Sequence, residues 1–209
     1  MSGAAEIDAA EIGGLRQEIT SRIGLMNAIV ALELAALGTG LSVLRESTHV
    51  LAGLAIISSF LWLLWMDQSL STFKIAAYLA IELGPRLEEG AGRPTLRWEL
   101  FLRQVEAGGT ASVGALYRHA PPPGACGISR TIRADWYVTL LFGGTSPVMV
   151  LLYVLDSLRH HTATAALTVF CAAAALIWLV AISRFRDFVQ NSKAIDAAIR
   201  NAAPARSTR

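Results

Sequence analysis

The chain has 209 residues, of which 54 % are apolar and only 16 % are charged, with a formal net charge of +2 and a mean hydropathy of +0.48. A soluble chain of this length has about a quarter of its residues charged. This composition excludes an ordinary soluble domain and predicts that lipid is the solvent for much of the chain.

The apolar residues are gathered into four long stretches instead of being spread along the chain. A helix needs about 20 apolar residues to cross a hydrocarbon core of roughly 30 Å. Four stretches reach or approach that length: residues 23–44, 49–66, 136–155 and 162–183. We therefore predict an all-α polytopic membrane protein with four transmembrane helices and a small helical cytoplasmic collar.

Basic residues predict how these helices are oriented. The segment between the second and third stretches contains eight Lys and Arg residues and the tail after the fourth contains six, whereas the two remaining loops contain only Arg45 and Arg159. Short loops that stay in the cytoplasm retain positive charge. Both termini and the central segment are therefore expected in the cytoplasm of a cell inner membrane or plasma membrane.

This topology divides the chain into five parts. They are a cytoplasmic N-terminal helix (1–22), a first transmembrane hairpin (23–66), a cytoplasmic insert (67–133), a second hairpin (134–183) and a C-terminal helix and tail (184–209). In the insert we expect the second helix to continue until Gly84 and Pro85 stop it. A short amphipathic helix over 95–105 and a Gly/Pro-rich loop over 108–127 are expected to follow.

Aromatic and basic residues gather near the predicted inner interface. Tryptophans form belts at membrane interfaces, and arginines next to the membrane attract anionic lipids. Ordinary core packing of the tryptophans is the alternative. The predicted interface and lipid anchors are Trp62, Trp65, Trp136, Trp178, Arg130, Arg133, Arg184 and Arg186.

Two polar residues lie inside the first predicted span. Glu33 is ten residues after Ile23 and eleven before Leu44, which places a carboxyl group near the middle of the bilayer. Such a group is costly there and faces protein or water. It is either a polar lining, proton site or subunit contact, or an un-ionised acid hydrogen-bonded to a neighbouring helix. Asn27 is expected to join helices, on a different side of the helix from Glu33.

Small residues allow helices to approach closely in the first and fourth spans, including Gly38, Gly40 and the run 172–175. They suit packing within one chain and oligomerisation equally well. Gly143, Gly144 and Pro147 are expected to loosen or kink the third span.

The sequence contains no recognisable catalytic motif. His160, His161 and Asp156 cluster in one loop, but adjacent histidines make a poor metal site without further ligands. No nucleophile–base pair, phosphate-binding glycine loop or CxxC pair is present. We expect no enzymatic activity, no metal, no cofactor and no nucleic-acid partner.

The residues Leu15-Arg16-Gln17-Glu18-Ile19-Thr20-Ser21-Arg22 resemble an LRxEIxxR opening of small bacterial four-helix integral membrane proteins of unassigned function. The stretches 63–68 and 78–87 and the pair Trp98-Glu99 resemble a second block of the same family. That family often has an acidic–histidine pair where this chain has Asp67-Gln68. The resemblance covers roughly the first half of the chain and implies a four-helix membrane protein with a cytoplasmic insert, without any activity.

These observations leave two functional hypotheses. The first is a non-enzymatic, oligomeric protein of a bacterial inner membrane that forms a pore or disrupts the membrane, for example in anti-phage defence. The second is a membrane scaffold that docks a cytoplasmic protein partner through the arginine-rich insert and tail.

Overall fold

The computed structural model describes residues 2–44, 47–91, 136–160 and 165–202, and every element among them is helical. The predicted all-α class is confirmed. In chain order the elements are α1 (Ser2–Val43), α2 (His49–Tyr78), a π-helical turn η1 (Leu79–Leu83), α3 (Gly84–Ala91), α7 (Trp136–Arg159) and α8 (Ala165–Ala202).

Four helices are long and apolar enough to cross a membrane, as predicted. They lie within Glu6–Val43, His49–Gly90, Trp136–Arg159 and Leu167–Ile199. By length and composition, these four candidate spans indicate a multi-pass membrane protein in contact with lipid. The helix expected over 95–105, the loop over 108–127 and the anchors Arg130 and Arg133 lie outside the described residues.

The helix expected to stop at Gly84 and Pro85 instead continues to Ala91, so that prediction is wrong. Pro85 has no N–H to offer the carbonyl of Ile81, four residues earlier. The chain widens into the π-helical turn just before the proline, and the Gly84 N–H donates to the carbonyl of Leu79. This wider turn lets the helix pass the proline without a break.

The chain forms two compact units. The first, which we call the span unit, consists of Ser21–Leu70 and Asp135–Val189. The second unit consists of Met1–Thr20, Ser71–Ala134 and Gln190–Arg209, and its described parts are helical. All four predicted spans lie in the span unit.

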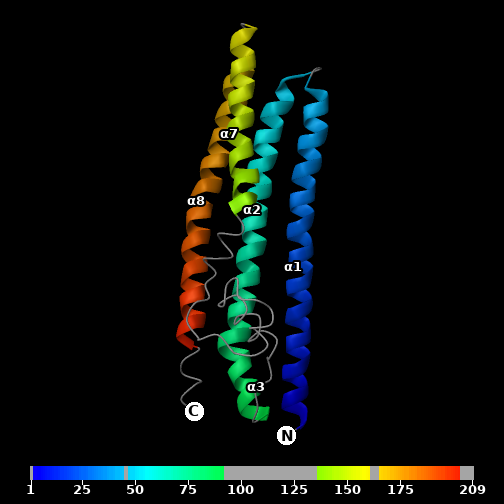
Figure 1. Ribbon diagram of the computed structural model, residues 1–209, viewed down its shortest axis with the longest axis vertical. Coiled ribbons are helices and arrows are strands. Elements are labelled where there is room, and N and C mark those ends of the chain that lie inside the picture. Colours follow the sequence, from blue (N-terminus) through cyan, green and yellow to red (C-terminus); the bar gives the residue numbers. More distant parts are fainter. Residues whose placement is uncertain (1, 45–46, 92–135, 161–164, 203–209) are drawn as a thin grey trace, which may run out of the picture. The chain divides into compact units, whose positions relative to one another are not determined.

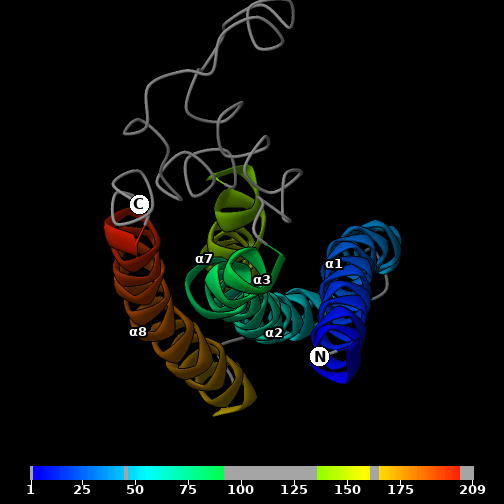
Figure 2. The ribbon, with the colours of Figure 1, turned by 90° about the horizontal axis from the view of Figure 1, so that it is seen from below.

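Within the span unit, α2 is the central helix. It lies between α1 and the α7–α8 pair in both views of the ribbon (Figures 1 and 2). Its buried residues include Leu51, Ala55, Trp62 and Trp65, so it presents an apolar face to each neighbour. One core cluster joins α2, α7 and α8 through Leu51, Ala52, Leu54, Ala55, Met149, Tyr153 and Ala174.

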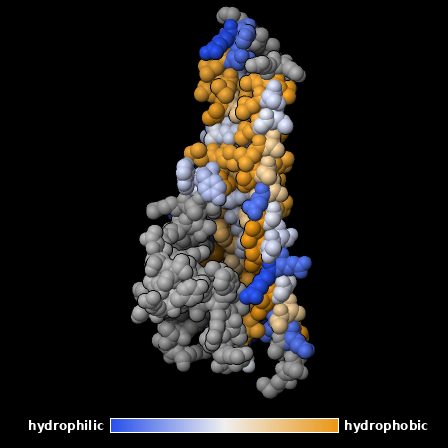
Figure 3. Space-filling model, turned by 45° about the vertical axis from the view of Figure 1, so that its right-hand side comes forward, coloured by the Kyte–Doolittle hydropathy of each residue, from blue (hydrophilic) through white to orange (hydrophobic). Residues whose placement is uncertain are grey.

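The outer surface of the span unit is apolar. Large hydrophobic side chains are exposed on α1, α7 and α8, among them Leu32, Leu34, Leu151, Leu176 and Leu179. Hydrophobic side chains dominate the upper part of the face shown in Figure 3. Helices that are apolar all round are typical of a lipid environment, because water would not solvate such a surface.

Candidate functional site

The most buried polar group of α1 is Glu33, whose side chain is only 1 % exposed. Its Oε1 atom lies 2.7 Å from the hydroxyl oxygen of Ser58 on α2. The same Ser58 oxygen lies 3.2 Å from the carbonyl oxygen of Phe142 on α7. One polar cluster therefore connects three helices in the middle of the span unit, where it is enclosed by protein.

Ser58 uses its hydroxyl group differently from other hydroxyl residues of the spans. Ser59 bonds to the carbonyl of Ala55 on its own helix, and Thr39 bonds to that of Ala35. Such bonds within a helix turn are the usual choice for serine and threonine. Ser58 instead contacts two other helices, so it holds helices together across the bundle.

Asn27, predicted to join helices, lies on an exposed face of α1. Among the described residues 6–43 of this helix, only Ile29 and Glu33 are buried. Gly40 is a point of close approach to α2, because a Cβ atom added there would lie 2.7 to 3.0 Å from the tip of Leu54. A Cβ atom added at Gly38 would meet nothing within 4 Å.

Pro147 does not break α7, and its effect is seen one turn earlier. Because proline has no N–H, the carbonyl of Gly143, four residues before it, lacks its helical donor. The indole Nε1 of Trp178 on α8 donates to this carbonyl oxygen at 2.9 Å. The spacing of Gly143 and Pro147 was visible in the sequence, but the helix that supplies the donor was not.

Gly143 also makes room for Trp62. A Cβ atom at position 143 would lie 2.9 Å from Cη2 of the Trp62 ring, so only glycine fits this contact. The ring of Trp62 also packs against Phe185, with ring centroids 5.3 Å apart. Its own Nε1 is buried and has no hydrogen-bond partner. The contact between α2, α7 and α8 is thus made by shape more than by polar groups.

The four tryptophans predicted as interface anchors occupy different environments. Trp62 and Trp65 are 1 % and 6 % exposed and lie in the core, where Trp65 packs on Phe188. Trp178 is partly buried against α7, and Trp136 is 62 % exposed at the start of that helix. Only Trp136 lies as a surface belt residue would. Arg184 and Arg186 are both exposed on α8, and their role as lipid anchors stays a prediction.

A second polar contact lies near the first turn of α2 and was not predicted. The hydroxyl of Tyr153 on α7 lies 2.6 Å from Nδ1 of His49, and the His49 ring also packs near Phe170 of α8. His160, which is exposed, lies 3.4 Å from the half-buried Asp156. No group of three or more His, Cys, Asp or Glu residues that could hold a metal occurs in the described part of the chain.

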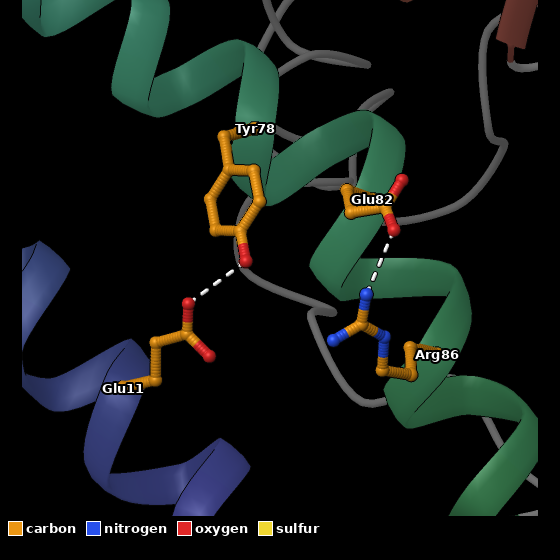
Figure 4. Close-up of polar contacts among 4 residues, drawn as sticks. All are labelled: Glu11, Tyr78, Glu82 and Arg86. Carbon is orange, nitrogen blue, oxygen red and sulfur yellow. Dashed lines mark hydrogen bonds and ion pairs between the residues drawn. The ribbon is translucent and has the colours of Figure 1, made fainter.

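In the second unit, one exposed polar pair joins α1 to α2, and another joins residues one helical turn apart (Figure 4). The Tyr78 hydroxyl donates to Oε1 of Glu11 at 2.8 Å, and Arg86 pairs with Glu82 at 2.7 Å. The bond to Glu11 raises the pKa of Tyr78, because losing the phenolic proton would place two negative charges side by side. Exposed pairs of this kind contribute little to stability.

Comparison with protein-family models, with curated proteins and with solved structures gives no match. The four long apolar helices agree with the small four-helix membrane proteins that the N-terminal motif resembles, whereas the family resemblance itself finds no support. The function must therefore be argued from the span unit.

Proposed function

We propose that the chain is a non-enzymatic protein of a bacterial inner membrane, with both termini in the cytoplasm, that acts as an oligomeric, membrane-disrupting effector. In this proposal the packed span unit is the resting arrangement, and α1 is the helix that leaves it. The observation that carries the proposal is the nature of the buried contact of α1: among its described residues only Ile29 and Glu33 are buried, and one of these two is a carboxyl group.

Leaving the bundle changes the surroundings of Glu33 more than those of any apolar residue. In the packed arrangement its carboxyl group is enclosed and bonded to Ser58. After separation, the Glu33 carboxyl, the Ser58 hydroxyl and the Phe142 carbonyl would face lipid near mid-membrane. Polar groups at this depth recruit water or one another. Several copies that gather around such groups would make the bilayer permeable.

The uninterrupted helix α1 supports a cytoplasmic trigger. It runs from Ser2 to Val43, through both units, without a break. A partner that pulls on its N-terminal part would act directly on the segment that contains Glu33. The alternative function, a scaffold that docks a cytoplasmic protein, is favoured by the apolar outer surface and by the closed bonding of Glu33, since a static anchor needs nothing more.

Locking α1 onto α2 distinguishes the two functions. A Cβ atom at position 40 would lie 3.0 Å from Cγ of Leu54, so the Cβ atoms of two cysteines would be within about 4.5 Å, close enough for a disulfide. Gly40→Cys and Leu54→Cys are introduced together after Cys126→Ser and Cys171→Ala remove the native thiols. The same purified protein, oxidised or reduced, is then tested for dye leakage from vesicles of anionic lipid.

If the protein is an effector, the reduced form causes dye leakage from the vesicles, and the oxidised form causes at least tenfold less. Equal leakage from both forms would overturn the requirement for α1 to move. No leakage from either form or from the wild type, at any protein density, would favour the scaffold. Thiol titration of each sample shows whether the disulfide has formed.

Substitutions of Glu33 test the same proposal without a cross-link. Both Glu33→Gln and Glu33→Leu are expected to abolish leakage and toxicity of the overexpressed protein. Glutamine keeps the resting packing, because its amide can replace the acid in the bond to Ser58, whereas leucine weakens assembly by about 1 to 2 kcal/mol. A leucine variant that is fully assembled and fully active would contradict any role for this carboxyl group.

A further inference from the structure

Ser58 has too few hydrogens for the contacts that surround it. Its hydroxyl group carries one hydrogen, yet its oxygen lies within hydrogen-bond distance of two acceptors, Glu33 Oε1 at 2.7 Å and the Phe142 carbonyl at 3.2 Å. A carbonyl oxygen cannot donate. If each contact is a full two-centre hydrogen bond and the Ser58 hydrogen is not shared between both acceptors, the second hydrogen comes from the Glu33 carboxyl group.

The contact to Glu33 is the shorter of the two, and 2.7 Å is an ordinary length for an O–H···O bond, whichever of the two oxygens donates. The neighbouring Ser59 shows that a carbonyl of the same helix is available to serines of α2. Ser58 uses its hydroxyl group on the α7 carbonyl instead. Its position suits a group that accepts from one helix and donates to another.

No charged partner compensates Glu33 among the described residues packed against it. On α2 the nearest titratable residues are His49 and Asp67, each nine residues or about 13 Å along the helix from Ser58. On α7, Tyr137 and Tyr153 lie five and eleven residues from Phe142, about 7 and 16 Å along the helix. A buried carboxylate with a single neutral hydrogen bond would be poorly compensated in hydrocarbon.

We propose that Glu33 is an un-ionised acid in the packed span unit and that its proton begins a directed chain of hydrogen bonds. The Glu33 acid donates to the Ser58 hydroxyl, and Ser58 donates to the Phe142 carbonyl. The chain runs from α1 through α2 to α7. The proton of the Glu33 acid is therefore part of the packing, because it makes the hydrogen bond that joins α1 to α2. This inference concerns the packed arrangement alone and does not depend on leakage.

Infrared spectroscopy of the full-length protein in lipid vesicles at neutral pH tests the assignment. The wild type should show the carbonyl stretch of a protonated carboxylic acid, and this band should disappear in Glu33→Gln. Asp196→Asn is the control, because Asp196 is another buried carboxyl group but lies outside the spans. Absence of the band from the wild type, or its survival in Glu33→Gln, would overturn the proposal.

The direction of the chain is tested at the two neighbouring serines. Ser58→Ala removes the acceptor of the acid hydrogen, so the band should remain and move to higher frequency. Ser59→Ala should leave the band where it is, because Ser59 bonds only within its own helix turn. A band that is unmoved by Ser58→Ala would show that the Glu33 proton goes elsewhere. Since Glu33→Gln is expected to keep the packing, loss of its band is not explained by misfolding.

Discussion

The two sides of α2 are built differently. Toward α1, the contact includes the polar cluster around Glu33, a hydrogen bond from Arg22 to Gln68 at 3.0 Å and a close approach at Gly40. Partly buried apolar residues of α1 also pack against the core cluster, namely Ala36, Leu37 and Leu44. Toward α7 and α8, the contact consists of a core cluster and an aromatic group in which Trp62 fills the space above Gly143. The α1 side combines polar contacts between side chains with partly buried apolar packing, whereas the α7–α8 side is fitted around aromatic rings.

This difference shows what holds helices together when lipid surrounds them. Lipid tails are as apolar as leucine, so burial of apolar surface alone contributes little to helix association in a bilayer. Close packing and hydrogen bonds remain. The α7–α8 side relies mainly on packing, which depends on shape. The α1 side relies on a few contacts, and these can be lost together.

The largest effect is expected from a methyl group added at Gly143. Gly143→Ala places a Cβ atom 2.9 Å from the Trp62 ring, which is buried and packs against Phe185. The strain of such overpacking should cost about 1 to 3 kcal/mol, measured as a lower thermal midpoint in detergent.

Gly144→Ala is the matched control, since its Cβ atom would meet only Leu140, at 4.0 Å. Alanine is the better helix former, so this variant should gain up to about 1 kcal/mol. Equal behaviour of the two variants would mean that Trp62 is not confined by Gly143.

A smaller effect is expected from the indole that bonds to the Gly143 carbonyl. Trp178→Phe removes this bond and should cost about 1 kcal/mol beyond the lost ring volume. In a Pro147→Ala background, residue 147 regains an N–H that can donate to the same carbonyl, so Trp178→Phe should cost less there. Chemical or thermal unfolding of the four proteins gives a coupling free energy of about 0.5 to 1 kcal/mol. A coupling of zero would show that the tryptophan does not replace the missing donor.

The smallest effect is expected on the α1 side. Gly40→Ala brings a Cβ atom as near to its neighbour as Gly143→Ala does, but the neighbour is the flexible tip of Leu54. Leu54 can shift, and alanine favours the helix, so the net change should stay within about 0.5 kcal/mol. Gly38→Ala, with nothing within 4 Å, should be slightly stabilising. If Gly40→Ala cost as much as Gly143→Ala, the two sides of α2 would be equally rigid and the comparison would fail.

Composition and spacing alone were enough to predict the four spans and the all-α class. In hydrocarbon the backbone must satisfy its own hydrogen bonds, in a helix or in a closed barrel, and a continuous apolar stretch of about 20 residues fits the helix. Counting residues also placed Glu33 near the middle of its apolar stretch, because a helix rises by a constant amount per residue, and its depth in a bilayer stays a prediction. Counting residues did not predict which face of α1 packs against α2.

Tertiary structure decided which neighbour each special residue meets. Trp62 and Trp65 share their residue type and their place near a span end with Trp136, yet two are in the core and one is on the surface. Pro85 predicted a helix end, but the helix continues because a π-helical turn just before the proline accommodates the residue that lacks an N–H. The carbonyl freed by Pro147 found a donor on α8, 35 residues from Gly143 in sequence. The composition of a segment determines whether lipid or water surrounds it. The contacts between helices depend on how each helix is rotated about its axis and shifted along it, and only packing in three dimensions determines both.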